Sequence, residues 1–154
     1  MEYSDLDPAI HYRRPWNAGK NVGPKRPLKP RDIWAIRFYL DEHKRLRDRA
    51  LFDLAIDSKL RGCDLVKIRI DYLGHLSTRQ YARLVDEWVS TIGLDKREYG
   101  THSMRRTKAA LIYKASGNLR AVQILLGHTN IENTVRYLGV DIDDALTLSE
   151  RTEI

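Results

Sequence analysis

The chain has 154 residues, a length typical of about one domain. It is 42% hydrophobic and 31% charged, with a mean hydropathy of -0.51, and no apolar run approaches the ~18 residues that cross a bilayer, so the composition excludes a membrane span. The first residues lack an apolar signal segment and the single Cys63 cannot close an intrachain disulfide, so we expect a cytoplasmic protein. The formal charge of +6 favours a polyanionic partner.

The positive charge is concentrated near the N-terminus. Residues 8–31 carry seven basic residues and no acid, and they are rich in proline. We therefore expect residues 1–28 to form a basic, flexible arm rather than a helix. The C-terminal residues 141–154 have the opposite sign, with five acids and one arginine, and are expected to form an acidic helix or tail.

Apolar residues at helical spacing predict that the remainder is a single, mainly α domain. The clearest apolar face lies in residues 78–92, where Ser77 and Gln80 match a capping box. Gly117, Gly127 and Gly139 are placed to close three later helices. Only residues 67–70 read as a strand, and a short one. The predicted helices cover residues 31–47, 48–60, 78–92, 102–116, 118–126, 130–138 and 141–149.

Five polar residues remain once the helical faces are assigned. Arg61 follows the second predicted helix, and His102 and Arg105 lie three residues apart at the start of another. His128 follows a helix-closing glycine, and Tyr137 comes nine residues later. Each has an ordinary explanation when taken alone, as a surface arginine, a half-buried tyrosine or a histidine bonded to a free carbonyl. Their joint order is the informative observation.

This order and spacing resemble the catalytic domain of tyrosine recombinases, the phage integrase family. The flanking residues 100–107 and 123–129 are also similar to the family's sequence boxes, and the resemblance covers roughly residues 29–140. It implies a helical catalytic domain that cleaves DNA through a covalent 3′-phosphotyrosyl intermediate, without ATP, a metal or another cofactor. The resemblance assigns the nucleophile to Tyr137.

The chemistry independently favours these residue types. Charge that develops on a phosphodiester must meet fixed donors, and Arg61 and Arg105 can form such a clamp. A phenol with a pKa near ~10 is a weak nucleophile at neutral pH, so a base or a nearby positive charge must assist it. His102 is our candidate to accept the proton. The resemblance gives His128 a hydrogen bond to the scissile phosphate.

One interval departs from the family pattern. Only 41 positions separate Arg61 from His102, where the resemblance places a three-stranded sheet with a catalytic lysine, the general acid for the leaving oxygen. We expect that sheet to be largely missing, and Lys67 lies too close to Arg61 to take the lysine's role. A separate N-terminal core-binding domain is also expected to be absent.

The sequence thus predicts three segments: the arm (1–28), a recombinase-like catalytic domain (29–140) and the C-terminal tail (141–154). A DNA-binding tyrosine recombinase, slowed by loss of general acid assistance, is the favoured interpretation. The alternatives are a noncatalytic DNA-binding remnant or regulator and, less favoured, a helix-turn-helix binder or an unrelated helical protein. We expect duplex DNA and further copies of the chain as partners. The predicted DNA contacts are Arg13, Arg14, Lys20, Lys25, Arg26, Lys29, Arg31, Arg106, Lys108 and Arg120.

Overall fold

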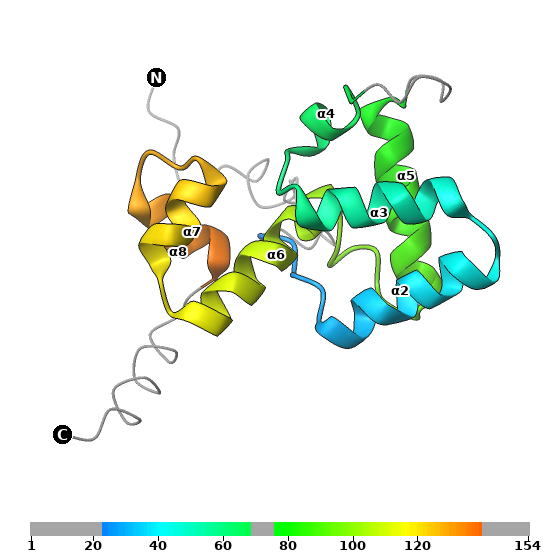
Figure 1. Cartoon of the computed structure of the whole chain (residues 1–154), viewed down its shortest axis with the longest axis horizontal. Helices are drawn as coiled ribbons and strands as arrows, with labels where there is room; N and C mark the ends of the chain where they lie inside the picture. The colour runs from blue at the N-terminus through cyan, green and yellow to red at the C-terminus, as the bar shows by residue number, and fades with distance from the viewer. Residues whose placement is uncertain (1–22, 69–75, 140–154) are drawn as a thin grey trace, which may run out of the picture.

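A computed structural model describes residues 23–68 and 76–139 of the chain, and these are helical with no strand among them. The mainly α fold is therefore confirmed. The predicted helix at 141–149 and most of the basic arm lie outside the described residues. Figure 1 shows the helices, which are α2 (Pro30–Glu42), α3 (Leu46–Asp57), α4 (Gly62–Leu65), α5 (Thr78–Thr91), α6 (Thr101–Ser116), α7 (Leu119–Leu126) and α8 (Ile131–Leu138).

The larger hydrophobic core lies between α2, α3 and α5. Leu40 from α2, Phe52 from α3 and Trp88 from α5 are all fully buried there. The Phe52 and Trp88 rings meet edge to face with their centres 5.5 Å apart, an arrangement that aromatic quadrupoles favour. The core explains why the apolar stripe of residues 78–92 is the clearest helical pattern in the sequence.

A smaller core joins α6, α7 and α8. Ala109, Val122 and Leu126 are buried in it, with Tyr137 packed at its edge. The helix α6 links the two cores, because its Met104 belongs to the first and its Ala109 to the second. In Figure 1 it runs from the α2–α5 group to the α7–α8 pair. The position of α6 therefore determines where the two groups of helices meet.

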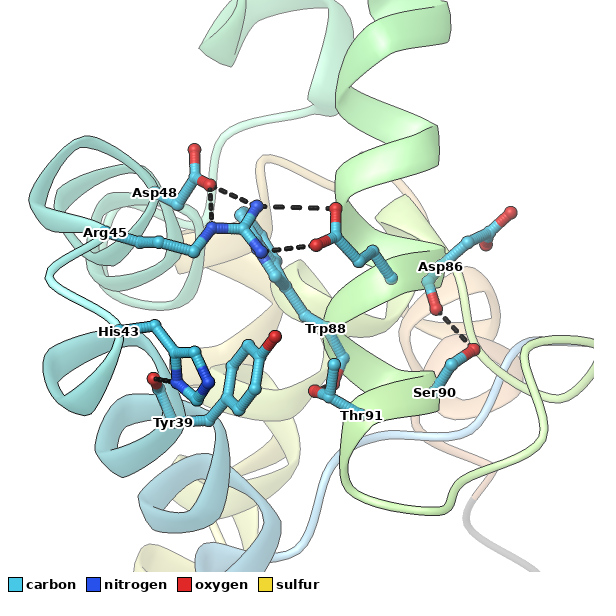
Figure 2. A network of polar contacts seen from close by, with 9 residues as sticks. Tyr39, His43, Arg45, Asp48, Asp86, Trp88, Ser90 and Thr91 are labelled. Carbon is cyan, nitrogen blue, oxygen red and sulfur yellow. Dashed lines mark hydrogen bonds and ion pairs between the residues drawn. The ribbon is translucent and has the colours of Figure 1, made fainter.

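The predicted first helix is too long. It was expected to continue to Arg47, but α2 ends at Glu42 and α3 begins at Leu46. In the turn, Lys44 has a left-handed backbone (φ 53°), and Arg45 donates to Asp48 of α3 (2.8 Å) and to Glu87 of α5. Figure 2 shows this network beside the Tyr39 and His43 rings, which are tilted by 33° with their centres 4.2 Å apart. The early helix end is thus fixed by contacts between helices.

Other predicted boundaries are confirmed. The Ser77 hydroxyl accepts from the Gln80 N–H (3.1 Å) while the Gln80 side chain accepts from the Ser77 N–H (2.8 Å), which is the expected capping box. Gly117, Gly127 and Gly139 end their helices in left-handed conformations. The expected strand fails at its start, since Lys67 lies in a turn after α4; residues 69 and 70 fall outside the described ranges.

Residues 23–29 run along α6 and belong to the folded part of the chain. Leu28 is buried in the larger core, and its N–H donates to the Thr107 hydroxyl (2.8 Å). The Arg26 N–H donates to the Glu98 carbonyl (2.9 Å). The helical domain consequently begins before residue 29. Within ranges 23–68 and 76–139, no helix combines the length and the apolar character needed to cross a membrane.

Candidate active site

Arg61 occupies the N-cap position of the short helix α4. Lys59, two residues earlier, has a left-handed backbone (φ 57°), which turns the chain sharply after α3. The Leu65 side chain anchors α4 in the larger core, while the Arg61 side chain is exposed. The turn and the short helix together present the arginine to solvent.

Helix α6 supplies His102 and Arg105. The Arg105 guanidinium donates through Nη2 to the Leu126 carbonyl at the end of α7 (2.6 Å), and its Nε is buried without a hydrogen-bond partner in the described part of the chain. His102 lies one turn earlier on α6 and is exposed. One face of α6 is therefore tied to the loop that carries His128.

The loop after α7 is fixed by Gln123. This side chain is buried, and its amide donates to the carbonyls of His128 (2.9 Å) and Thr129 (3.2 Å). The His128 ring lies against α8, where its Nδ1 is 3.0 Å from the buried Thr134 hydroxyl. When that hydroxyl donates, the second ring nitrogen carries the proton and is free to donate to a ligand. Gln123 and Thr134 thus orient His128.

Tyr137 lies one turn after Thr134 on α8. Its ring meets the His128 ring edge to face, with the centres 5.4 Å apart. The Tyr137 hydroxyl is buried and, within the described ranges, has no hydrogen-bond partner. Burial raises the pKa of this phenol, while the charges of Arg105 and Arg106 act in the opposite direction. The phenol is therefore neutral and covered in this arrangement.

Electrostatics link Arg61 to the other residues. The pKa of His128 lies below its ordinary value, because burial and then the charges of Arg105 and Arg61 disfavour the imidazolium. Contacts bring Arg105, His128 and Tyr137 together from α6, the α7–α8 loop and α8, and the charge of Arg61 on α4 acts on His128. Among the described residues, the His102 side chain makes no hydrogen bond or ion pair that joins it to this group.

Arg106 requires a correction. It was expected to contact DNA phosphate, but its side chain is only 5% exposed, and its guanidinium donates to backbone carbonyls of Lys25, Arg136 and Tyr137. Adjacent residues of a helix point about 100° apart, so α6 cannot present Arg105 and Arg106 to the same surface. Nothing in the amino-acid pattern indicates which of the two faces inward.

The remaining predicted DNA contacts differ in their surroundings. Arg31 has a side chain 80% exposed, and Lys29 is exposed at the start of α2. Lys108 pairs with Asp57 (2.7 Å), and Arg26 pairs with Glu98 (3.1 Å). The other expected contacts are bonded within the fold or lie outside the described residues. Lys25 donates to the Arg97 carbonyl, Arg120 donates to Gln123, and Arg13, Arg14 and Lys20 fall in the undescribed segment.

Sequence reasoning missed Gln123 and Thr134. Both are uncharged polar residues that are buried, and each acts on His128 rather than on a ligand. Gln123 lies inside the similar segment 123–129, so its position was visible but its contacts were not. Thr134 precedes Tyr137 by three residues, a helical spacing that places both on one face of α8.

Comparisons show which known proteins this chain is similar to. The model of the phage integrase family matches residues 72–143. The tyrosine recombinase XerC of Syntrophus aciditrophicus (strain SB) is 33% identical over 78 residues, which are 51% of this chain and 25% of the relative. The XerC of Pelobacter propionicus (strain DSM 2379 / NBRC 103807 / OttBd1) is 30% identical over 125 residues, 81% of this chain and 36% of the relative.

A solved structure of the XerH site-specific recombinase bound to difH substrate, a pre-cleavage complex, has a TM-score of 0.64 at 14% identity and covers 85% of this chain and 55% of that one. A post-cleavage complex of XerH with palindromic difH gives a TM-score of 0.60 at 15% identity. The fold is therefore that of a tyrosine recombinase catalytic domain. The chain resembles the phage integrase family over residues 72–143, and it spans between a quarter and about a third of the length of these curated relatives.

Proposed function

We propose that this chain binds duplex DNA and cleaves one strand through Tyr137, forming a covalent 3′-phosphotyrosyl intermediate of site-specific recombination. The observation that supports this most is the contact between His128 and Tyr137 together with the charges of Arg61 and Arg105, which come from separate segments of the chain. The XerH neighbours are recombinases bound to DNA, which favours duplex DNA as the ligand.

In the proposed reaction, the Tyr137 oxygen attacks the phosphorus of a phosphodiester. A bond forms between that oxygen and phosphorus, and the bond from phosphorus to the 5′ oxygen breaks. The phenol proton passes to His102, and water protonates the departing 5′ oxygen, since the described residues offer no lysine in the place that the family pattern gives it. The phosphotyrosyl bond retains the energy of the broken phosphodiester, so rejoining requires no ATP.

The two arginines would stabilise the phosphate as charge accumulates on its nonbridging oxygens. Arginine suits this role because it stays protonated and donates from a planar fork. His128 would add a hydrogen bond from the ring nitrogen that faces away from Thr134. His102 reaches the phenol only if the Tyr137 hydroxyl, which is buried here, turns outward when DNA binds.

A pool of nicked duplexes with randomised sequence tests the proposal. A nick close to the cleavage point lets the short product diffuse away, so that the covalent intermediate accumulates. We expect a protein–DNA adduct that survives denaturant, and sequencing of the trapped DNA would identify the target site. Tyr137→Phe should abolish the adduct and leave duplex affinity within about twofold, because it removes one hydroxyl and no charge.

A second candidate function is DNA binding without cleavage. The buried, neutral Tyr137 hydroxyl favours it, as does the absence of a strand from residues 23–68 and 76–139, where the family's lysine hairpin would otherwise lie. Salt-sensitive duplex binding with no adduct from any sequence in the pool would support this candidate. An adduct that persists in the Tyr137→Phe variant would instead assign the nucleophile to another residue.

A further inference from the structure

Arg106 is a buried cation at the junction of three segments. It lies on α6 with 5% of its surface exposed, and within the described ranges no carboxylate pairs with it. Burial alone lowers its pKa. A buried charge is costly unless hydrogen bonds and nearby dipoles compensate for it, so its partners indicate why the fold retains it.

The partners are backbone carbonyls and one aromatic ring. Nε donates to the Tyr137 carbonyl, Nη2 to the Arg136 carbonyl (3.2 Å) and Nη1 to the Lys25 carbonyl (2.5 Å). The guanidinium carbon also lies 5.2 Å from the centre of the Tyr137 ring, within the range of a cation–π contact. Every donor-bearing nitrogen of this side chain is therefore used.

The position of these carbonyls gives the contacts a consequence for α8. Arg136 and Tyr137 lie in the last turn of α8, which ends at Leu138, and the final carbonyls of a helix have no partner within the helix. A cation at that end also interacts favourably with the helix dipole. Arg106 thus holds both the end of α8 and the ring that α8 carries.

We infer that Arg106 is a positioning residue for Tyr137, which joins the end of α8 to α6 and to the segment at Lys25. The preceding residue of α6, Arg105, points about 100° away and donates to the Leu126 carbonyl. One helix therefore positions both the proposed phosphate clamp and Tyr137. The role as a positioning residue in catalysis rests on the proposed function. The fixed location of the ring can be measured without DNA.

Lysine cannot reproduce these contacts. Its ammonium is a compact charge on a flexible chain, whereas the guanidinium is a planar fork whose donors point in fixed directions. Arg106→Lys keeps the charge near the ring but cannot reach carbonyls of both Lys25 and α8 in the same geometry. Arg106→Gln removes the charge as well. The two variants therefore distinguish the effect of the positive charge from the effect of the planar arrangement of donors.

The test places 3-fluorotyrosine at position 137 and records its fluorine NMR signal in the full chain without DNA. In the parent protein we expect one signal, displaced from that of the unfolded chain. Arg106→Gln should move the signal most of the way to the unfolded position, and Arg106→Lys should move it partly. Lys114→Gln is the matched control, because it removes one positive charge from an exposed position of the same helix and should leave the signal unchanged.

The second measurement is the single-turnover rate of adduct formation. Misplacement of a reacting group by about 1 Å can reduce a rate by roughly 10²-fold, so we expect Arg106→Gln to slow the reaction at least tenfold. Duplex affinity should change by less than about twofold, since the guanidinium is buried. If Arg106→Gln unfolds, as circular dichroism would show, Arg106→Lys carries the comparison.

The possible outcomes separate the two proposals. An unchanged fluorine signal in both Arg106 variants would overturn the positioning role, whatever the chain does to DNA. A lysine variant that matches the parent in signal and rate would also overturn it, because the fork would then be unnecessary. If the parent forms no adduct on any duplex, the proposed cleavage function fails, while displaced signals in the variants still support the hold of Arg106 on Tyr137.

Discussion

A buried hydroxyl on α8 contacts the ring of His128. Thr134 is fully buried and lies 3.0 Å from the ring nitrogen Nδ1, so it can fix the proton on the opposite nitrogen, where a phosphate would be met. Nothing in the amino-acid sequence alone distinguishes Thr134 from a surface threonine. Its importance follows from burial and from one contact.

Thr134→Val tests this role because it replaces the hydroxyl by a methyl group of similar size. A net hydrogen bond of about 1 kcal/mol corresponds to roughly a five- to tenfold change in rate, and we expect adduct formation to slow by that factor. Thr134→Ser keeps the hydroxyl and is the matched control. Equal rates for the valine variant and the parent protein would show that His128 is oriented by other contacts.

The pKa of His128 reports whether Arg61 faces the site. The charges of Arg105 and Arg61 both lower this pKa, so Arg61→Ala should raise it toward ~6.5, the value of an unperturbed histidine. An NMR titration of the His128 ring proton measures the change without DNA. Arg47→Ala removes an exposed cation from α3 and should leave the titration unaltered. An unchanged pKa in Arg61→Ala would contradict the shared neighbourhood of the two residues.

The same shift gives stability a defined pH dependence. Because the folded pKa of His128 lies below the unfolded value, the unfolded chain takes up this proton first as the pH falls. The free energy of unfolding should therefore decrease as the pH drops through ~6.5, and the decrease should level off below the folded pKa. In Arg61→Ala the two pKa values approach one another, so urea denaturation should show a smaller decrease.

At the scale of whole elements, the turn between α2 and α3 carries local strain. Lys44 has a positive φ, which costs a residue with a side chain roughly 1–2 kcal/mol. Lys44→Gly removes that strain but gives the unfolded chain more freedom, so we expect a net gain of about 0.5 kcal/mol in the free energy of unfolding. Urea denaturation measures it. Lys96→Gly is the control, because this exposed lysine has no positive φ. Glycine at position 96 should therefore not raise the free energy of unfolding.

This turn also shows where sequence reasoning fails. Helix ends marked by local chemistry, such as the Ser77 cap and Gly127, could be predicted because the signal lies within a few residues. The end of α2 could not be predicted, because Arg45, the N-cap residue of the next helix α3, is bonded to Glu87, which is 42 residues away. The buried orientation of Arg106 was missed for the same reason. Both depend on which helix face meets a partner.

On the scale of the molecule, α6 determines how the candidate site is assembled. The helix spans both hydrophobic cores, and its neighbouring residues Arg105 and Arg106 reach α7 and α8 respectively. In the described part of the chain, α5 occupies the interval where the family resemblance placed a sheet. Arg61, Arg105, His128 and Tyr137 all lie outside the interval in which the resemblance places the sheet. Their arrangement therefore does not depend on strands, and residues 23–68 and 76–139 contain none.

The basic charge of the whole chain leads to the final prediction, which concerns residues 1–22. The segment that follows them is bonded to the domain through Arg26 and Leu28, so a deletion should stop at residue 22 to leave the fold intact. It removes three cations, Arg13, Arg14 and Lys20. Each neutralised phosphate contributes roughly -0.9 to the slope of log K against log salt, so duplex binding should lose up to about 2.7 of that slope.

A full-length variant with Arg13→Gln, Arg14→Gln and Lys20→Gln is the matched control, because it removes the same three cations but keeps the chain length and the acids Glu2, Asp5 and Asp7. Fluorescence anisotropy of a labelled duplex across a salt series measures the slope for both proteins. Equal flattening in the two would assign the effect to phosphate contacts. A slope equal to that of the parent in both would exclude residues 1–22 from the DNA interface and leave the exposed cations at the start of α2, Lys29 and Arg31, as the basic contacts nearest the N-terminus.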